Sequence, residues 1–278
     1  MTSSFNWADV PKGHDNPLSY AVSARDRTVI EMVNHAVKHK QVMLAFQTVV
    51  PSANQHQPAF YEGLVRVLDE TGRIIPARDF IDVIEATETG RIIDCLALEK
   101  GIQTLSENPG LRLSINMSAR SIGYSRWTRI LRRGLKSDPT VAERLILEIT
   151  ESSAMLVPEL VVGFMNEVQR KGISFALDDF GAGYTSFRYL KDFYFDILKI
   201  DGQFIRGIAH DSDNQILTAA LSSVAEQFDM VTVAESVEKP EDAEYLAQMG
   251  IDCLQGYYFG APTVNPPWQE RGMTQASA

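Results

Sequence analysis

The sequence predicts an α/β protein that folds as a single (β/α)8 barrel of the TIM type. The chain has 278 residues, and such barrels commonly run to about 250 residues as one domain. Short apolar runs alternate with longer stretches of helical period through the middle of the chain. Eight such runs fall between residues 42 and 254, which is the strand number of the barrel. An open, doubly wound sheet is the alternative.

Each apolar run is predicted to be a strand: Val42–Val50, Phe60–Leu68, Leu111–Asn116, Leu145–Ile149, Ile173–Leu177, Ile197–Ile200, Val231–Ala234 and Asp252–Leu254. The predicted helices between them are Ala77–Leu105, Trp127–Leu135, Pro158–Arg170, Ser186–Asp192, Asn214–Phe228 and Pro240–Met249. Proline suits a first helical turn and glycine the position after a last one, as at Pro240 and Gly250. No helix separates the first two strands. We therefore expect the first strand to be antiparallel to the rest, and the others to form parallel βα units.

Residues 1–25 are polar, contain proline and glycine, and are predicted to be an N-terminal leader, with a helix from about Asp26 to Lys40. The barrel domain is expected over residues 26–262 and an irregular tail over 263–278. No stretch approaches the ~20 apolar residues of a membrane span, and the leader lacks the apolar core of a signal peptide. Two cysteines are too few for a disulfide framework. A cytoplasmic protein is therefore expected.

The charge balance is acidic, with 26 basic and 36 acidic residues and a net charge of −10. Such a surface disfavours non-specific binding to duplex nucleic acid or to anionic membranes. An anionic substrate would then need metal ions or a local cluster of positive charge.

Polar residues stand at or just beyond the ends of most predicted strands. They are Asn116, Glu148 with Glu151, Asp178 with Asp179, Lys199 with Asp201, Glu235 with Glu238, and Gln255. The carboxyl ends of barrel strands form one rim, where active sites lie. Glu62 instead stands near the start of its run, with Arg66 four residues on. That position is what an antiparallel strand would need to reach the same rim.

The predicted rim gathers five carboxylates, from Glu62, Glu148, Asp178, Asp179 and Glu235. They cannot all stay ionised so close together without cations. Oxygen ligands favour Mg²⁺ or Mn²⁺ over zinc. Two such ions about 3.5–4 Å apart would suit phosphoester hydrolysis. The alternative is that these polar residues are helix caps and ordinary loop charges. That would explain a polar residue at one strand end, but it explains six such strand ends less well.

At these residues the sequence resembles the EAL family, bacterial phosphodiesterases that hydrolyse cyclic di-GMP, over about Asp26 to Pro262. The motifs are Glu62-Gly63-Leu64 followed by Arg66, Ser114-Ile115-Asn116, Leu147-Glu148-Ile149-Thr150-Glu151, Asp178-Asp179-Phe180-Gly181, Leu198-Lys199-Ile200-Asp201, Ala234-Glu235 with Val237-Glu238, and Gln255-Gly256-Tyr257. Each motif is weak alone, but together, in this order and spacing, they are highly specific.

The resemblance implies a role for each matched residue. Glu62, Asn116, Glu148 and Asp178 match the ligands of one metal ion, and Asp178, Asp179 and Glu235 those of the second. Catalytic roles are implied for Lys199, which holds the attacking water and helps to deprotonate it, for Glu235, and for Glu151, which anchors the loop Phe180–Thr185. Substrate contacts are implied for Gln47, Leu64, Arg66, Gln255 and Glu238. The implied reaction opens one phosphodiester of cyclic di-GMP to give linear pGpG.

The resemblance also implies a homodimer through the region after Asp179. The aromatic residues there, Tyr184, Phe187, Tyr189, Phe193, Tyr194 and Phe195, suit an interface or the packing of a helix on the barrel. Three positions depart from the family pattern: Gly63 replaces alanine, Thr48 replaces proline, and Ser236 replaces glycine. Two alternatives to an active enzyme stay open. One is an EAL domain that binds cyclic di-GMP as a receptor but turns it over poorly. The other is an unrelated metal-using barrel or a purely structural scaffold.

Overall fold

The computed structural model describes residues 17–182 and 190–268. The chain divides into two compact units, the first made of residues 1–42 and 66–90, and the second of residues 43–65 and 91–278. Among the described residues, no helix is both long enough and apolar enough to cross a membrane.

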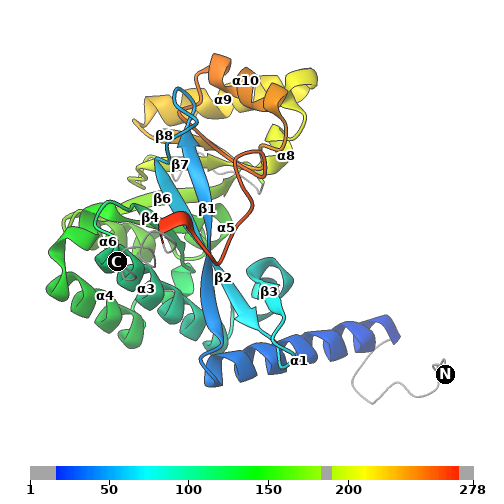
Figure 1. Cartoon of the computed structure of the whole chain (residues 1–278), viewed down its shortest axis with the longest axis vertical. Coiled ribbons are helices and arrows are strands. Elements are labelled where there is room, and N and C mark those ends of the chain that lie inside the picture. Colours follow the sequence, from blue (N-terminus) through cyan, green and yellow to red (C-terminus); the bar gives the residue numbers. More distant parts are fainter. Residues whose placement is uncertain (1–16, 183–189, 269–278) are drawn as a thin grey trace, which may run out of the picture. The chain divides into compact units, whose positions relative to one another are not determined.

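Eight strands close the predicted barrel (Figure 1). They are β1 (Val42–Pro51), β2 (Phe60–Leu68), β4 (Leu113–Asn116), β5 (Leu145–Thr150), β6 (Ser174–Phe180), β7 (Ile197–Ile200), β8 (Val231–Ala234) and β9 (Cys253–Gln255). Each pairs with the next in this order, and β1 pairs with β9 to close the ring. The prediction of a TIM-like barrel is confirmed.

Strand direction confirms one expectation and corrects another. β1 runs antiparallel to β9, with Val49 opposite Gln255, as expected for the first strand. β2, however, runs parallel to β4, with Glu62 opposite Ser114. The argument that Glu62 needs an antiparallel strand to reach the rim is therefore wrong. Glu62 belongs to a parallel strand that continues for six residues beyond it, as far as Leu68.

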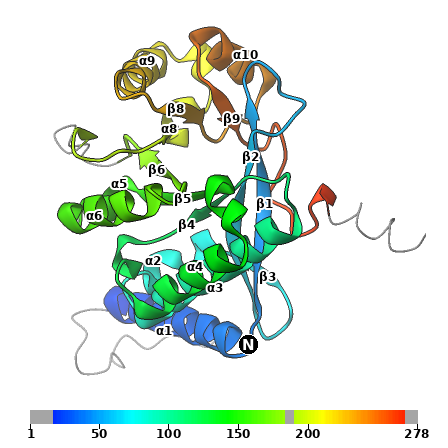
Figure 2. The ribbon, with the colours of Figure 1, turned by 90° about the vertical axis from the view of Figure 1, so that its left-hand side faces the viewer.

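Helices follow most of the barrel strands: α3 (Glu88–Glu107), α4 (Ser125–Ser137), α5 (Glu151–Ala154), α6 (Pro158–Gln169), α8 (Gly202–Ile205), α9 (Ser212–Gln227) and α10 (Pro240–Met249). Short 3₁₀ turns are η2 (Ala119–Ser121), η3 (Pro139–Arg144) and η4 (Ile208–His210). Figure 2 shows α3 beside α4, and α9 and α10 near β8 and β9. The predicted helix Ser186–Asp192 falls mainly on residues outside the described part of the chain.

The first unit contains α1 (Pro17–Lys38), β3 (Ile74–Pro76), η1 (Ala77–Asp79) and α2 (Ile81–Ile84). Helix α1 begins within the stretch predicted as a leader. The single helix predicted over Ala77–Leu105 is instead η1, α2 and α3. β3 pairs antiparallel with the end of β2, Arg66 lying opposite Pro76.

Inside the barrel, one layer of side chains is apolar. It consists of Val49, Phe60, Ile146, Ala176, Ile197, Val233 and Cys253, all buried, which we call the apolar layer. Side chains two residues apart on a strand point to the same face. The next interior position on each strand is therefore fixed, and it is the one that carries the polar residues.

Candidate metal and active site

Two positions along from the apolar layer, the interior side chains become polar. On the parallel strands Phe60 is followed by Glu62, Ile146 by Glu148, Ala176 by Asp178, Ile197 by Lys199, Val233 by Glu235 and Cys253 by Gln255. On the antiparallel β1 the order reverses, and Gln47 precedes Val49. We call these residues, with Asn116 of β4, the polar layer. The period of two therefore explains why these residue types recur along the chain.

Lys199 lies at the centre of the polar layer and is only 1% exposed. Its Nζ is 2.7 Å from Glu235 Oε1, 2.8 Å from Glu148 Oε2, 2.9 Å from Asp178 Oδ1 and 3.3 Å from Glu62 Oε2. A buried ammonium is stable only when it is paired. The four carboxylates therefore hold Lys199 in its charged form, and Lys199 holds them together.

Glu62 is oriented by two amide side chains. Asn116 Nδ2 donates to Glu62 Oε1 at 2.7 Å, and Gln255 Nε2 donates to Glu62 Oε2 at 2.6 Å. Gln255 also donates to Gln47 Oε1 at 3.2 Å, and Gln47 Nε2 donates to the Gly260 carbonyl at 3.1 Å. With its amide nitrogen on Glu62, Asn116 turns its oxygen away from that carboxylate. The structure thus brings Glu62, Asn116 and Gln255 of the predicted rim together, and it places Gln47 beside them.

Burial and charge act in opposite directions on Glu62 and Lys199. Burial disfavours the charged form of Glu62, but the charge of Lys199 and the hydrogen bonds from Gln255, Asn116 and Lys199 outweigh it, so the pKa of Glu62 is lowered. Burial would also lower the pKa of Lys199. The negative charges of Asp178, Glu148, Glu235 and Glu62 outweigh that effect and raise its pKa well above the usual value.

The pKa values of Glu148, Glu235 and Asp179 are raised by burial and by neighbouring negative charges. Burial, then the charge of Glu62, raises the pKa of Glu148 well above its usual value despite Lys199. Burial raises the pKa of Glu235 to about 8, even though Lys199 acts against it. Burial, then Asp178, raises the pKa of Asp179 to about 6. One lysine therefore does not neutralise this site, and further positive charge would be bound favourably.

The donor set fits divalent cations. With all five carboxylates ionised, they and the one ammonium sum to −5 + 1 = −4, which two divalent cations would cancel. Glu148 Oε1 is buried and has no hydrogen-bond partner, which a metal ion would supply. Asp178, Asp179 and Glu235 each offer an oxygen, all within 4.8 Å of one another. The oxygens of this second group lie close to one another, whereas Glu62, Glu148 and Asp178 are brought together by their contacts with Lys199.

A β-bulge explains how two consecutive aspartates serve one group. The register between β6 and β7 shifts between Leu177 and Phe180, and Asp179 has the left-handed φ of 55°. In a regular strand Asp178 and Asp179 would point to opposite faces. The strand was predicted to end at Leu177, but it continues through the bulge to Phe180. Backbone strain of this kind is typical of functional sites.

Glu151 stands outside the polar layer but touches the segment that follows Asp179. It is buried at the first position of α5, and its Oε2 accepts a hydrogen bond from the Gly181 amide at 3.3 Å. The predicted loop Phe180–Thr185 is described only as far as Ala182; its remaining residues lie outside the described chain.

Three predicted substrate residues are not drawn into the polar layer. Leu64 is half-buried on β2. Arg66 belongs to the first unit. Glu238 is exposed, and one of its carboxylate oxygens is 3.8 Å from Arg206 Nε. Sequence reasoning also missed two residues that hold the chain after Asn116, Asp94 and Ser153. For Asp94 a signal existed, because it is a single charge within the apolar stretch Ile92–Leu98.

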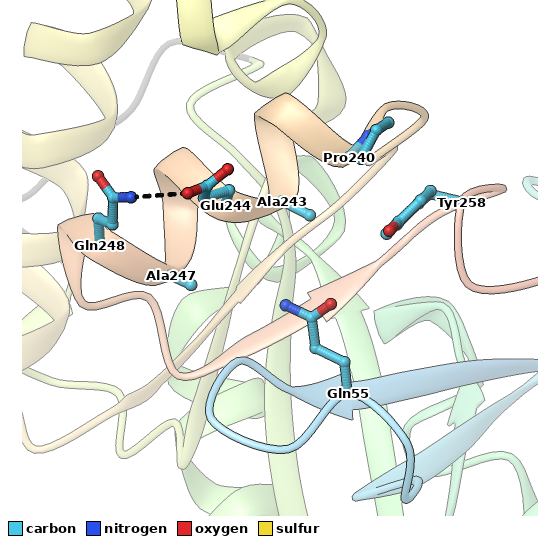
Figure 3. Close-up of a pocket in the computed structure, with 7 residues that line it drawn as sticks. All are labelled: Gln55, Pro240, Ala243, Glu244, Ala247, Gln248 and Tyr258. Atoms are coloured by element: carbon cyan, nitrogen blue, oxygen red, sulfur yellow. Dashed lines mark hydrogen bonds between the residues drawn. The ribbon is translucent and has the colours of Figure 1, made fainter.

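A separate groove of about 480 Å³ lies between α10, the loop that joins β1 to β2, and Tyr258 (Figure 3). Pro240, Ala243 and Ala247 of α10 line it together with Gln55, and Gln248 donates to Glu244 at 3.3 Å. No residue of the polar layer lines this groove.

Fold and site together define a TIM-like barrel with a buried carboxylate–lysine cluster in its interior. The profile of the family described as "EAL domain" matches residues 30–262. The chain therefore belongs to the EAL domain family.

Its relatives include proteins that are named cyclic di-GMP phosphodiesterases. The chain is 32% identical over 238 residues to "Cyclic di-GMP phosphodiesterase PdeF" of Escherichia coli K12, a match that covers 84% of this chain and 32% of PdeF. This chain thus spans about a third of the length of the curated relatives it matches.

Solved structures share the fold over most of the chain. "PaMucR Phosphodiesterase, c-di-GMP complex" superposes with a TM-score of 0.75 at 27% identity, covering 87% of this chain and 99% of the other. An EAL domain protein of Listeria monocytogenes EGD-e also gives a TM-score of 0.75 at 27% identity, covering 90% and 98% of the two chains.

Proposed function

We propose that this chain is a metal-dependent phosphodiesterase that hydrolyses one phosphodiester bond of cyclic di-GMP to give linear pGpG. The observation that carries the proposal is the polar layer, with four carboxylates around one buried lysine, and a fifth carboxylate, Asp179, beside Asp178 and Glu235. Together they hold more negative charge than the lysine balances. The names of the relatives, cyclic di-GMP phosphodiesterase and a phosphodiesterase in complex with c-di-GMP, supply the substrate.

The proposed cofactor is a pair of Mg²⁺ or Mn²⁺ ions. Glu62, Asn116, Glu148 and Asp178 would hold one ion; Asp178 would be shared, and Asp179 and Glu235 would complete the second set. When bound, the ions activate water and stabilise the negative charge that develops on the phosphate. The partnerless Oε1 of Glu148 and the short distances among Asp178, Asp179 and Glu235 support this division.

The proposed role of Lys199 follows from its charge. Because four carboxylates raise its pKa, Lys199 stays an ammonium and donates hydrogen bonds. It would hold the attacking water by a hydrogen bond and stabilise the negative charge that develops on the oxygen of that water. Gln255, which also donates to Gln47, would fix Glu62. Gln255, Gln47, Leu64 and Glu238 would contact the dinucleotide. Glu151 would keep the Gly181 backbone, and so Asp178 and Asp179, in place.

The decisive experiment is product analysis by chromatography after incubation of the protein with cyclic di-GMP and Mg²⁺. We expect pGpG with Mg²⁺ or Mn²⁺, none with excess chelator, and inhibition by Ca²⁺, whose longer and looser coordination holds substrate without positioning the water. Glu62→Ala, Asn116→Ala and Asp178→Ala should each abolish turnover. Full activity in chelator would refute the two-metal proposal.

A receptor that binds cyclic di-GMP with poor turnover is the alternative outcome of that experiment. Substrate binding without pGpG, in the presence of either metal, would establish it. The receptor alternative is supported only by Gly63, which lacks the methyl group of the alanine that the family pattern has at this position. In the structure, Ile115 Cδ1 takes up that space, 2.7 Å from where a Cβ would stand. The tight packing beside Glu62 therefore favours the enzyme.

We also propose that the protein is a cytoplasmic homodimer. In the described part of the predicted interface, Phe193 and Phe195 are buried, with their ring centroids 5.5 Å apart, while Tyr194 is 64% exposed. Only Tyr194 is therefore free to face a second copy; Tyr184, Phe187 and Tyr189 lie outside the described residues. Sedimentation should show a dimer at micromolar concentration. A monomer that keeps full specific activity on dilution would overturn the dimer.

A further inference from the structure

The chain that leaves Asn116 is fastened by a carboxylate on α3. Asp94 Oδ2 accepts hydrogen bonds from the Ser118 amide at 3.0 Å and from Ser121 Oγ at 2.6 Å. Asp94 is only 8% exposed, and a buried carboxylate is retained only where its hydrogen bonds offset the loss of water. Bonds to an ionised acceptor are also about twice as strong as neutral ones. Asp94 therefore fixes the backbone two residues after Asn116.

The same segment is also held by a residue of α5. Ser153 Oγ accepts a hydrogen bond from the Ala119 amide at 2.8 Å, and it lies 3.4 Å from Ser118 Oγ. Ser153 is itself buried and placed by its own amide, which donates to Thr150 Oγ1 at 3.2 Å. We call Asp94 and Ser153, with the segment 118–121 between them, the clamp.

The clamp connects two parts of the polar layer. Asn116 precedes the clamped segment on the chain, and the Met117 amide between them donates to the Glu148 carbonyl at 2.9 Å. Ser153 shares the four-residue helix α5 with Glu151, whose carboxylate accepts from Gly181 just beyond Asp179. Ligands from β4 and from β6 are thus braced through one short helix.

We infer that Asp94 and Ser153 are positioning residues that hold Asn116 at the distance and orientation needed to bind a divalent cation. The inference rests on the proposed function only in taking Asn116 as a metal ligand. Neither residue touches substrate or metal. Partners of this kind, which orient ligands from outside, change metal affinity or activity by about 10- to 100-fold when they are removed.

The test measures Mn²⁺ binding directly, by the electron paramagnetic resonance signal of free Mn²⁺, in the full chain without substrate. Asp94→Ala should weaken Mn²⁺ binding by about 10- to 100-fold. Asp94→Asn keeps the shape and one acceptor oxygen but loses the charge, so it should recover only part of that loss. Full recovery would instead show that Asp94 acts by packing alone. The matched control is Glu99→Gln, the same loss of charge on α3, where Glu99 is an exposed partner of Arg133 at 2.8 Å. It should bind Mn²⁺ like the wild type.

Ser153→Ala tests the other half of the clamp independently. It should weaken Mn²⁺ binding, and with Asp94→Asn the two losses should not add, because both hold the same segment. In turnover, both variants should require more metal for half-maximal rate while kcat at saturating metal changes less.

The outcomes separate the inference from the proposed function. If the wild type binds no Mn²⁺, both fall. If the wild type binds Mn²⁺ and the Asp94 and Ser153 variants bind it equally well, the clamp is structural only and the proposed function stands. Lower melting temperatures with unchanged Mn²⁺ affinity would likewise overturn the inference.

Discussion

The apolar and the polar layer of the barrel are built from the same strands, two residues apart. The apolar layer is stabilised by removing side chains from water, which needs no specific partner. The polar layer buries Glu62, Glu148 and Lys199 just as completely, yet each depends on particular atoms of the others. The difference teaches that the apolar layer tolerates single substitutions and the polar layer does not. It also predicts that metal changes the stability of variants in the polar layer only.

The largest expected effect comes from breaking the polar layer at Lys199→Met. In chelator this should lower the free energy of unfolding by about 3–5 kcal/mol, because removing one partner leaves buried charges uncompensated. Added Mg²⁺ should restore much of the loss, while turnover stays lower by about 10²–10³-fold, because a donor that stabilises developing negative charge is missing. Chemical denaturation with and without metal measures both states.

The control lies two residues away on β7, in the apolar layer. Ile197→Val should cost only about 0.5–1.5 kcal/mol, with or without metal. The comparison would be contradicted if added metal left the free energy of unfolding of Lys199→Met unchanged, as it should for Ile197→Val.

A smaller effect is expected where the layers meet the helices, at Gly63. A Cβ there would stand 2.7 Å from Ile115 Cδ1, and one at Gly101 would stand 2.9 Å from the same atom. Gly63→Ala should therefore destabilise the protein by about 1–3 kcal/mol.

The second variant for this site is Gly63→Ala with Ile115→Val, which removes the obstructing carbon. The pair should be less destabilised than the sum of the two single changes. Additive losses in thermal denaturation would show that Ile115 does not occupy the space of the missing methyl.

At Ser236, just beyond Glu235, the expected effect is about 1 kcal/mol. Its φ of 57° is left-handed, and its Oγ accepts from Arg206 Nη2 at 3.1 Å. Ser236→Gly and Ser236→Ala both lose the hydrogen bond, but only glycine relieves the backbone. The glycine variant should therefore be the more stable by about 1 kcal/mol, and equal melting temperatures would argue against strain there.

The smallest expected effect concerns Cys253 and tests whether water reaches the apolar layer. Burial, then the charge of Asp252, raises the pKa of its thiol to about 11. At pH 8 about one thiol in a thousand is then ionised, so alkylation should be slow in the native protein and fast after unfolding. Mass spectrometry of iodoacetamide-treated protein follows the rate, and rapid native labelling would mean that water reaches this layer.

Much of this architecture could be predicted because apolar runs and polar strand ends both follow local sequence. The strand over Val231–Ala234 and the helix over Pro240–Met249 have the predicted bounds. β3 was missed because its three residues include Pro76 and carry no periodicity. The direction of β2 was misjudged for a different reason. The absence of a helix between β1 and β2 indicates that these two strands run in opposite directions, but it does not indicate which of the two is parallel to the rest of the barrel.

Within the site, sequence reasoning identified residues but not their contacts. Lys199 was placed on the rim, yet its central position among four carboxylates depends on the register of strands far apart in the chain. The left-handed turn at Asp179 follows from a bulge that no local signal marks. Asp94 lies 24 residues before Ser118, so nothing short of the tertiary structure links them.

The closure of the ring by β1 and β9 has a consequence for the protein's synthesis. Gln255, from the last strand, donates to Glu62 and to Gln47, from the first two. Until residue 255 has left the ribosome, strand β9 is missing from the barrel around the acidic cluster. Glu62 then lacks one of the two amides that orient it. A nascent chain therefore cannot complete this centre strand by strand as it emerges. The strand that is made last, β9, decides whether the earlier strands become a site.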